Sequence, residues 1–401
     1  MTRPLPRGGT FLLAAIAGTA IANNYAIQPA LTTVATDLDI PLPVIGLVPT
    51  AALAGCMAGF ALLLPLTDHL APHRLIAAQL TALAAALALA AAAPGPVLLL
   101  AAYLLIGAAA GVAAQAGNIA GRHAPPDRRG TDVATVAAGM SAGILLSRLV
   151  GGALTEILGW RQMLLVFAAL ALLGSIAAHR LLPRQRPRPE HSYRSTLASL
   201  PPLLHRHPRL RLAVATGGLW YLAVNLVWVA LPLALAQPPY SLGPTTIGLY
   251  SLAGLLGFAA LPFTGRLTDR YSPRTVISAA ILTAAAGTTL LATGLSTPPV
   301  TTLGLALFDA GCFAAQAANQ SRVIALDPHR SGSLSSVYLV LYFTIGAIGT
   351  ALAAPLLDTL GWQGTTLTAL AALLLAAALG LAGEASPRLD RRPAAHGGRV
   401  R

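Results

Sequence analysis

Apolar segments of about 20 residues follow one another along almost the whole chain, separated by short polar or proline-containing stretches. A helix that crosses the roughly 30 Å hydrocarbon layer of a bilayer needs about 20 residues, so each segment is long enough to span a membrane. We therefore predict an all-α integral membrane protein with twelve transmembrane helices in two six-helix bundles. The predicted spans are residues 10–31, 44–66, 75–93, 97–121, 132–156, 163–182, 210–235, 246–265, 276–295, 300–323, 333–357 and 365–383.

Charge is scarce and one-sided in this chain. Only 10% of its residues are charged, whereas about a quarter are charged in a soluble fold, which excludes a soluble enzyme, a disordered chain and a nucleic-acid-binding protein. All 26 basic residues are arginine, and 24 of them fall on one side if the N-terminus is cytoplasmic. This pattern predicts a bacterial-type cytoplasmic membrane protein with both termini in the cytoplasm, whose basic face contacts anionic lipid.

The chain divides at residues 183–211, a polar stretch rich in proline and arginine that we interpret as a cytoplasmic basic linker. It separates an N-terminal bundle, residues 1–182, from a C-terminal bundle, residues 212–401, which ends in a short cytoplasmic tail. No nucleic-acid partner is expected, and the protein is predicted to function as a monomer in the lipid bilayer.

The two halves repeat each other. The segment Gln115-Ala116-Gly117-Asn118 recurs 201 residues later as Gln316-Ala317-Ala318-Asn319, and Glu156-Ile157-Leu158-Gly159-Trp160 recurs 202 residues later as Asp358-Thr359-Leu360-Gly361-Trp362. A common offset indicates a duplicated unit. Because each unit has six spans, the repeat is parallel, which favours a substrate site between the halves near the middle of the membrane.

Two loops carry related charge motifs. The loop after the eighth span reads Gly265-Arg-Leu-Thr-Asp269-Arg270-Tyr-Ser-Pro-Arg274, and a weaker copy after the second span keeps Asp68 and Arg74. On these residues the chain resembles the major facilitator superfamily. An aspartate flanked by arginines at a helix end can bond to the neighbouring half in one conformation and release it in another, so a gating role is expected. The alternative, arginines that only set orientation, stays open for Arg74 and Arg274.

Two further motifs are similar to a drug and sugar efflux branch of that superfamily. They are Asn24-Tyr25-Ala26-Ile27-Gln28-Pro29 in the first span, and Asp309-Ala310-Gly311 followed by Gln316, Asn319, Gln320 and Arg322 in the tenth. The resemblance implies export. The span-five antiporter motif is altered, because Ser147-Arg148 replaces its Gly-Pro pair, and Tyr103 stands where many proton-driven exporters have arginine. Import by proton symport therefore remains an alternative.

Two charges lie inside predicted spans, away from their ends: Arg148 and Asp309. Counting residues from the outer end of each span places them at nearly the same depth. Since charge within a membrane is costly unless it is paired or wetted, we expect the two to face each other as a pair that protonation of Asp309 breaks, coupling a proton to transport. The alternative is a permanent structural ion pair.

Polar stripes mark the first, fourth, seventh and tenth spans, which line the central cavity in the superfamily. Their uncharged amides and aromatics suit a neutral or mildly amphipathic solute, although hydrogen bonds that only pack helices together are the alternative. The candidate substrate-binding residues are Asn24, Gln28, Gln115, Asn118, Tyr221, Asn225, Trp228, Gln316, Asn319 and Gln320.

Motifs for catalysis, metal binding or nucleotide binding are missing from the sequence: it contains no HExxH and no Walker loop, and its two cysteines stand alone in apolar runs. We predict that the protein is not an enzyme and needs no cofactor, with a proton gradient as its energy source. The predicted function is secondary active export of a small organic molecule, drug-like, metabolite or sugar-like, by proton antiport and alternating access. Proton-coupled import and a non-transporting receptor with this fold are the alternatives.

Overall fold

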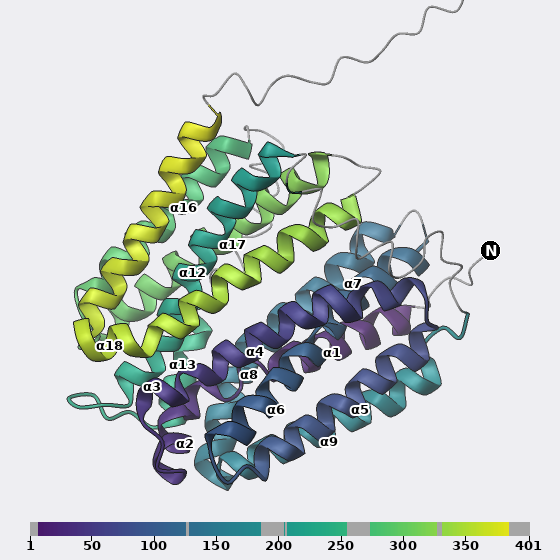
Figure 1. Cartoon of the computed structure of the whole chain (residues 1–401), viewed down its shortest axis with the longest axis horizontal. Coiled ribbons are helices and arrows are strands. Elements are labelled where there is room, and N and C mark those ends of the chain that lie inside the picture. Colours follow the sequence, from purple (N-terminus) through teal and green to yellow (C-terminus); the bar gives the residue numbers. More distant parts are fainter. Residues whose placement is uncertain are drawn as a thin grey trace, which may run out of the picture.

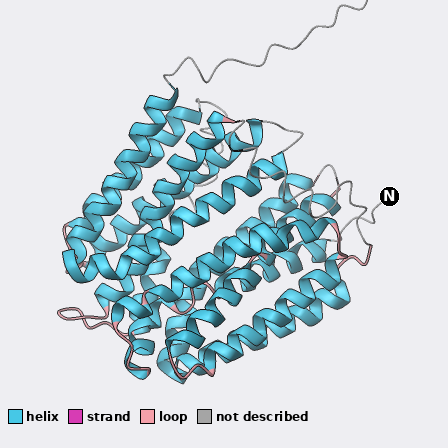
Figure 2. Ribbon diagram, viewed as in Figure 1, coloured by secondary structure: helices cyan, strands magenta, loops and turns pink. Residues whose placement is uncertain are grey.

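A computed structural model of the chain describes residues 7–125, 128–185, 204, 207–254, 273–326 and 331–384. Throughout these ranges the regular elements are helices, with no strand (Figure 2). This confirms the all-α prediction.

The N-terminal half contains long helices joined by short irregular turns. Its elements are α1 (Arg7–Ala22), η1 (Gln28–Ala30), α2 (Leu31–Asp37), α3 (Leu42–Ile45), α4 (Leu47–Ala58), η2 (Gly59–Leu63), η3 (Leu64–Asp68), α5 (Pro72–Ala91), α6 (Pro96–Ala110), α7 (Val112–His123), α8 (Arg129–Leu158) and α9 (Trp160–Leu181). The described elements of the C-terminal half are α12 (Pro208–Leu235), α13 (Pro244–Leu249), η4 (Tyr250–Leu252), α16 (Pro273–Ala292), α17 (Pro298–Leu326) and α18 (Ser331–Glu384).

Most of the predicted spans coincide with these helices. Nine helices of the described ranges are long and apolar enough to cross a membrane, and one of them, residues 334–382, covers two predicted spans. The first span corresponds to a shorter apolar helix, Gly8–Ala22. The eighth, residues 246–265, begins in α13 and continues outside the described residues, so the count of twelve stays a prediction.

The helices gather into two groups that follow the order of the sequence (Figure 1). Within the first group α1 packs on α8 and α5 on α9; within the second α12 packs on α18 and α16 on α17. The groups meet where α13 packs against α8 and α18 against α4. The bundle boundaries, 1–182 and 212–401, are not tested by this arrangement and stay predictions.

The contact between the two groups is close because small residues line it. A methyl group added at Gly46 of the first group would lie 2.7 Å from Cβ of Ala354, and one added at Gly248 would lie 2.7 Å from the carbonyl oxygen of Arg148. Small residues let helix backbones approach in membranes, where packing drives association. Hydrogen bonds add to this contact: Thr50 and Thr350 share one of 2.8 Å between their hydroxyls.

The first predicted span, residues 10–31, is not one continuous helix. α1 ends at Ala22, and an irregular turn over residues 23–27 leads into η1, whose second residue is Pro29. Proline lacks an N–H and its ring clashes with the carbonyl four residues earlier, so a regular helix cannot continue from Tyr25 through Pro29. The backbone of the turn remains satisfied, since Gln28 N donates to Tyr25 O over 3.0 Å. The break directs Tyr25 and Gln28 toward the neighbouring α8, as the next subsection describes.

The two copies of the repeat share an unusual backbone turn. Gly159, between α8 and α9, has a φ of 90°, and its counterpart Gly361, within α18, has a φ of 65°. Residues with a side chain rarely adopt such angles, so glycine is needed at both positions. At Gly361 the turn divides α18 into two spans. Each glycine precedes a tryptophan whose indole N–H is bonded: Trp160 to Asp37 Oδ2 at 3.1 Å and Trp362 to Leu291 O at 2.7 Å.

Candidate functional site

A buried tryptophan connects the two charges that the sequence places inside the membrane. Arg148 on α8 and Asp309 on α17 are 6% and 2% exposed. Trp228 on α12 donates its indole N–H to Asp309 Oδ1 over 2.9 Å, and the Arg148 guanidinium lies 4.3 Å from the centroid of the same ring. The predicted direct pair is not formed in this conformation, because no nitrogen of Arg148 lies within 4 Å of the Asp309 carboxylate, and such a pair stays a prediction. The indole contacts both groups instead.

Arg148 is held by an amide and two aromatic rings. Its Nε donates to Gln28 Oε1 over 2.8 Å, and its guanidinium also lies 4.8 Å from the centroid of the Tyr25 ring. Among the described residues no carboxylate is within 4 Å of it. Cation–π contacts are worth about 2 kcal/mol or more when they are shielded from water, which offsets part of the cost of burying the charge. Its positive charge is therefore not neutralised by a bonded anion.

The second oxygen of Asp309 faces a glycine. A methyl group added at Gly254 would lie 2.9 Å from Asp309 Oδ2 and 2.6 Å from Cδ2 of Leu145. The missing side chain at Gly254 therefore makes room for the carboxylate between α17, the start of the eighth span and α8. Among the described residues, the carboxylate of Asp309 accepts its hydrogen bond from the indole N–H of Trp228.

Aromatic side chains from both halves form a cluster. Tyr221 stacks on Tyr342 with ring centroids 4.0 Å apart, and Tyr338 lies 5.4 Å from Tyr342. Phe343 joins Tyr221 at 5.1 Å and reaches the other half at Phe60 at 5.0 Å. Such pairs contribute about 0.5–1.5 kcal/mol beyond the burial of their surface. The cluster includes Tyr221 of α12, the helix that also carries Trp228.

Sequence reasoning missed several of these residues as site candidates: Tyr25, Tyr338, Tyr342 and Phe343. Two signals were available. Tyr338 and Tyr342 are four residues apart and so share a helix face, and Tyr25 lies inside the Asn24–Pro29 motif.

The polar residues predicted in the seventh and tenth spans bond mainly to neighbouring helices and to backbone. Asn225 donates to Tyr221 O on its own helix over 2.8 Å. Gln316 Oε1 accepts from the Tyr338 hydroxyl over 2.7 Å, and Asn319 donates to Ala213 O over 2.9 Å. Gln316 and Asn319 thus connect α17 with α18 and α12. Gln320 is half-buried.

Among the predicted residues of the first and fourth spans, Gln28 bonds to Arg148, whereas Gln115 and Asn24 bond to other partners. Gln115 is fully buried in the first half, where it donates to Leu63 O over 2.8 Å and exchanges hydrogen bonds with Gln79. Asn24 donates to Cys56 Sγ over 2.9 Å, and Asn118 is exposed. Of the two predicted residues in the first span, Gln28 contacts Arg148.

The predicted gate has a different geometry in this conformation. Asp68 forms an ion pair with Arg122 of α7, which also donates to Thr67 O over 3.1 Å. Both partners belong to the first half, since Arg122, near the end of α7, reaches η3. The expected bond of Asp68 to the opposite half stays a prediction. Arg74 is exposed.

The second copy of the gate motif cannot be compared with the first. Asp269 and Arg270 lie outside the described residues, and Arg274 begins α16 with a side chain that is not described. The described ranges contain no group of three or more His, Cys, Asp or Glu side chains that could hold a metal ion.

The sequence matches a known family over most of its length. The profile of the Major Facilitator Superfamily matches residues 13–350 and, in an overlapping match, residues 213–399. "Probable transporter SCO4007" of Streptomyces coelicolor is 30% identical over 367 residues, which cover 91% of this chain and 85% of the relative. "Uncharacterized transporter YgaY" of Escherichia coli O157:H7 is 27% identical over 356 residues, which cover 89% and 90% of the two chains.

Solved structures have the same fold. The nucleoside transporter NupG, in a mutant form, superposes with a TM-score of 0.75 at 15% identity, covering 93% of this chain and 98% of that one. A D-xylose-proton symporter superposes with a TM-score of 0.73 at 15% identity, covering 93% and 97%. At this level of identity the likeness establishes the arrangement of the helices and nothing finer.

Proposed function

Since the chain belongs to the major facilitator superfamily, and is thus a multi-pass membrane transporter and not an enzyme, we propose that it exports a small organic molecule from the cytoplasm in exchange for protons. It works by alternating access, as a monomer and without a cofactor, and the proton gradient supplies the energy. The observation that carries this proposal is the contact of Arg148 and Asp309 with one indole, that of Trp228.

The three side chains come from both halves of the molecule. Arg148 belongs to α8 of the first half, whereas Trp228 and Asp309 belong to α12 and α17 of the second. Any movement of one half against the other therefore changes the stacking of Arg148 on Trp228. Alternating access consists of such a movement.

Proton binding acts on the same contact. The ionised carboxylate of Asp309 accepts a charge-assisted hydrogen bond from Trp228, which is roughly twice as strong as a neutral one. A proton on Asp309 removes that advantage, weakens the bond to the indole and leaves the nearby Arg148 cation without a compensating charge. The two protonation states thus favour different arrangements of the halves, which is the requirement for coupling.

The aromatic cluster supports an amphipathic solute. Tyr221, Tyr342 and Phe343 supply flat apolar faces, and Gln316 and Gln320 on α17 supply amides. Tyr25 and Trp228 extend these faces to the Arg148 cation. A neutral or mildly amphipathic molecule with a planar group fits this set better than a phosphorylated one.

The contacts between the halves support a conformation that faces the cytoplasm. With both termini in the cytoplasm, as the arginine distribution predicts, the outer ends of the helices carry the hydrogen bond between Thr50 and Thr350 and that from Thr245 N to Glu156 Oε2 at 3.2 Å. These contacts hold the halves together on the outer side. An exporter loads its solute from the cytoplasm in such a state.

Import by proton symport is the second candidate. The observation that favours it is the replacement of the Gly-Pro pair of the antiporter motif by Ser147-Arg148, which places a charge where the motif has none. A structural neighbour is a D-xylose-proton symporter. A receptor that binds a solute without moving it is the third.

Transport in proteoliposomes with an imposed pH gradient tests the proposal. A panel of amphipathic organic solutes is screened for flux, and a pH-sensitive dye reports proton movement. Solute and proton moving in opposite directions support antiport; the same direction means symport, and binding without flux means a receptor. Asp309→Asn should abolish coupled proton flux, whereas Asp358→Asn, which alters an exposed aspartate, should leave it unchanged. Normal coupling in Asp309→Asn overturns the proton role.

A further inference from the structure

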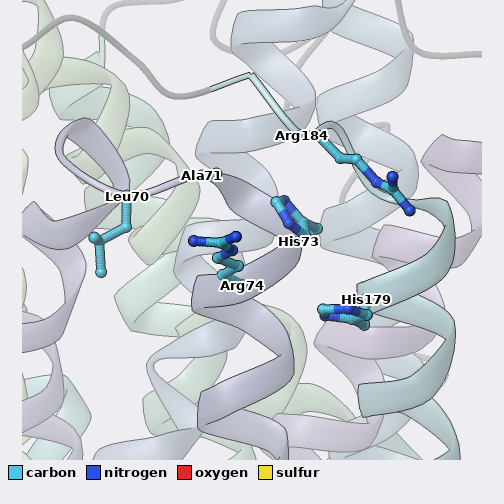
Figure 3. A pocket seen from close by; sticks show the side chains of 6 residues that line it. All are labelled: Leu70, Ala71, His73, Arg74, His179 and Arg184. Carbon is cyan, nitrogen blue, oxygen red and sulfur yellow. The ribbon is translucent and has the colours of Figure 1, made fainter.

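A cationic cavity lies at the adjoining ends of α5 and α9, away from the candidate transport site. Its volume is about 490 Å³, and Figure 3 shows His73 between Arg74 on one side and Arg184 and His179 on the other. The described residues that line it are Leu70, Ala71, His73, Arg74, His179 and Arg184, and none of these is acidic. We propose that this cavity binds the phosphate headgroup of an anionic phospholipid.

His73 carries a polar atom without a partner in this cavity. The residue is only 7% exposed, and its Nδ1 has no hydrogen-bond partner. Native structures rarely leave a buried polar group unbonded without a reason. The His179 ring lies 5.5 Å away, centroid to centroid. The His73 ring lines the cavity, so a rotation of the ring would turn the unbonded nitrogen toward it, where a phosphate oxygen would accept a hydrogen bond from Nδ1–H and remove the deficit.

The backbone brings further positive charge to the same place. α5 begins at Pro72, so the positive end of its dipole faces the cavity. The His73 N–H donates to Pro183 O over 3.4 Å, and this bond holds the segment that carries Arg184 against the start of α5. Arg74 and Arg184 can each offer a planar pair of N–H groups, the geometry that suits phosphate oxygens.

A groove with small side chains in its wall and basic residues at its end continues from this cavity along the two helices. A second cavity of about 600 Å³ shares Arg74 and His179 with the first and runs between α5 and α9. The hydroxyls of Thr81 and Ser175 in its wall bond to each other at 2.9 Å and to the Ala77 carbonyl. They are satisfied within the protein, so the groove offers small apolar surfaces. Its other lining residues are Ala78, Ile176 and Arg180.

The shape of the two cavities favours a lipid over free phosphate. A cationic head pocket that opens into an apolar groove matches an amphiphile whose anionic head and hydrocarbon chain are adjacent. The proposed orientation places the start of α5 and the end of α9 at the cytoplasmic surface, where anionic headgroups lie. An inorganic phosphate would use the head pocket only.

Lipid binding to the full-length protein, purified in detergent, provides the test. Native mass spectrometry measures the dissociation constants of phosphatidylglycerol and of phosphatidylcholine with identical acyl chains. Each arginine near an anionic headgroup contributes roughly a fivefold gain in affinity. The double variant Arg74→Gln/Arg184→Gln should therefore bind phosphatidylglycerol roughly 25-fold more weakly, and its affinity for phosphatidylcholine should be unchanged. Arg211→Gln removes an exposed arginine from the start of α12 and serves as the control.

A third variant and a competition experiment distinguish lipid binding from binding of free phosphate. His73→Phe keeps a ring of similar size but removes Nδ1, so it should weaken phosphatidylglycerol binding several-fold while the Tm stays the same or rises. Glycerol phosphate, the headgroup without chains, should compete only at concentrations far above those of the lipid. Competition at equal concentration would mean a free-phosphate site, and an unchanged affinity in the double variant would mean no anion site. Either result overturns the proposal.

Discussion

Trp228 donates its indole N–H to the carboxylate of Asp309 over 2.9 Å, and both side chains are at least 95% buried. Arg148, which belongs to the other half of the molecule, stacks on the same ring. Three residues therefore form one unit in which a cation, an aromatic ring and an acid are connected in series. A change at the acid therefore reaches the cation both through the ring and through the charge of the carboxylate.

Replacing Trp228 by phenylalanine separates the two functions of the indole. Trp228→Phe keeps an aromatic face for Arg148 but removes the N–H that bonds Asp309. Hydrogen bonds to charged groups are worth about 1.5–3 kcal/mol, so we expect the free energy of unfolding to fall by about that amount and proton-coupled transport to fall at least tenfold. Proteoliposome flux and denaturation in detergent measure the two effects.

The control for this variant lies on the same helix. Trp220 is fully buried on α12 and is not bonded to Asp309. Trp220→Phe is expected to change the free energy of unfolding but to leave proton-coupled flux intact. Equal loss of coupling in both variants would show that the hydrogen bond to Asp309 has no special role.

The space beside Asp309 is tested by adding a single methyl group. In Gly254→Ala the new carbon would lie 2.9 Å from Asp309 Oδ2 and 2.6 Å from Leu145 Cδ2. Overpacking of this kind typically costs about 1–3 kcal/mol, and displacement of the carboxylate should weaken its bond to Trp228. We expect a lower Tm and reduced coupled flux. Gly117→Ala is the matched control, since nothing lies within 4 Å of its added methyl; a loss there comparable to that of Gly254→Ala would contradict the steric argument.

The stability contributed by the ion pair between Asp37, after the first span, and Arg161, at the start of α9, should depend on pH. Arg161 and the indole of Trp160 donate hydrogen bonds to Asp37, and they lower its pKa below the ordinary value of about 3.9. Because the pKa is lowered in the folded state, this contribution is complete above about pH 4 and is lost as the pH falls through the folded pKa. The side chains are partly exposed, so the effect is small. Asp37→Asn should lower the Tm slightly at pH 7, and the Tm values of the two proteins should converge below pH 4. A difference that persists unchanged at pH 3 would show that charge is not its cause.

The helical spans could be predicted from the sequence by counting residues, and the family from the motifs that resemble it. Segment length predicts helices that span a bilayer, and distance from a span's end places Arg148 and Asp309 at one level. Counting does not give the rotation of each helix about its axis or the rotamer of each side chain. The indole of Trp228 therefore could not be predicted to contact both charges, although all three residues were named as candidates.

Other misses have local causes. The break after Ala22 could have been predicted from Pro29, since proline disrupts the preceding turn. Gln115 and Gln316 occupy equivalent positions of the repeat, yet Gln115 bonds to Gln79 and Gln316 to Tyr338. Their partners differ because the halves have diverged outside the repeated motifs. Sequence equivalence predicts a shared helix position and not a shared contact.

Arg148→Lys tests whether the charge alone is sufficient at this site. Lysine keeps the positive charge but loses the planar group that stacks on Trp228 and Tyr25, and with it the Nε that donates to Gln28. Buried cation–π contacts are worth about 2 kcal/mol, so we expect the free energy of unfolding to fall by about 2 kcal/mol and coupled flux to fall several-fold. Arg161→Lys is the matched control, because Arg161 also stacks on a tryptophan, Trp160, at 4.3 Å but lies at a partly exposed helix end. Its effect should be below about 1 kcal/mol, with flux unchanged. Wild-type flux and stability in Arg148→Lys would mean that the stacked geometry contributes nothing and that a point charge near Asp309 is all the site requires.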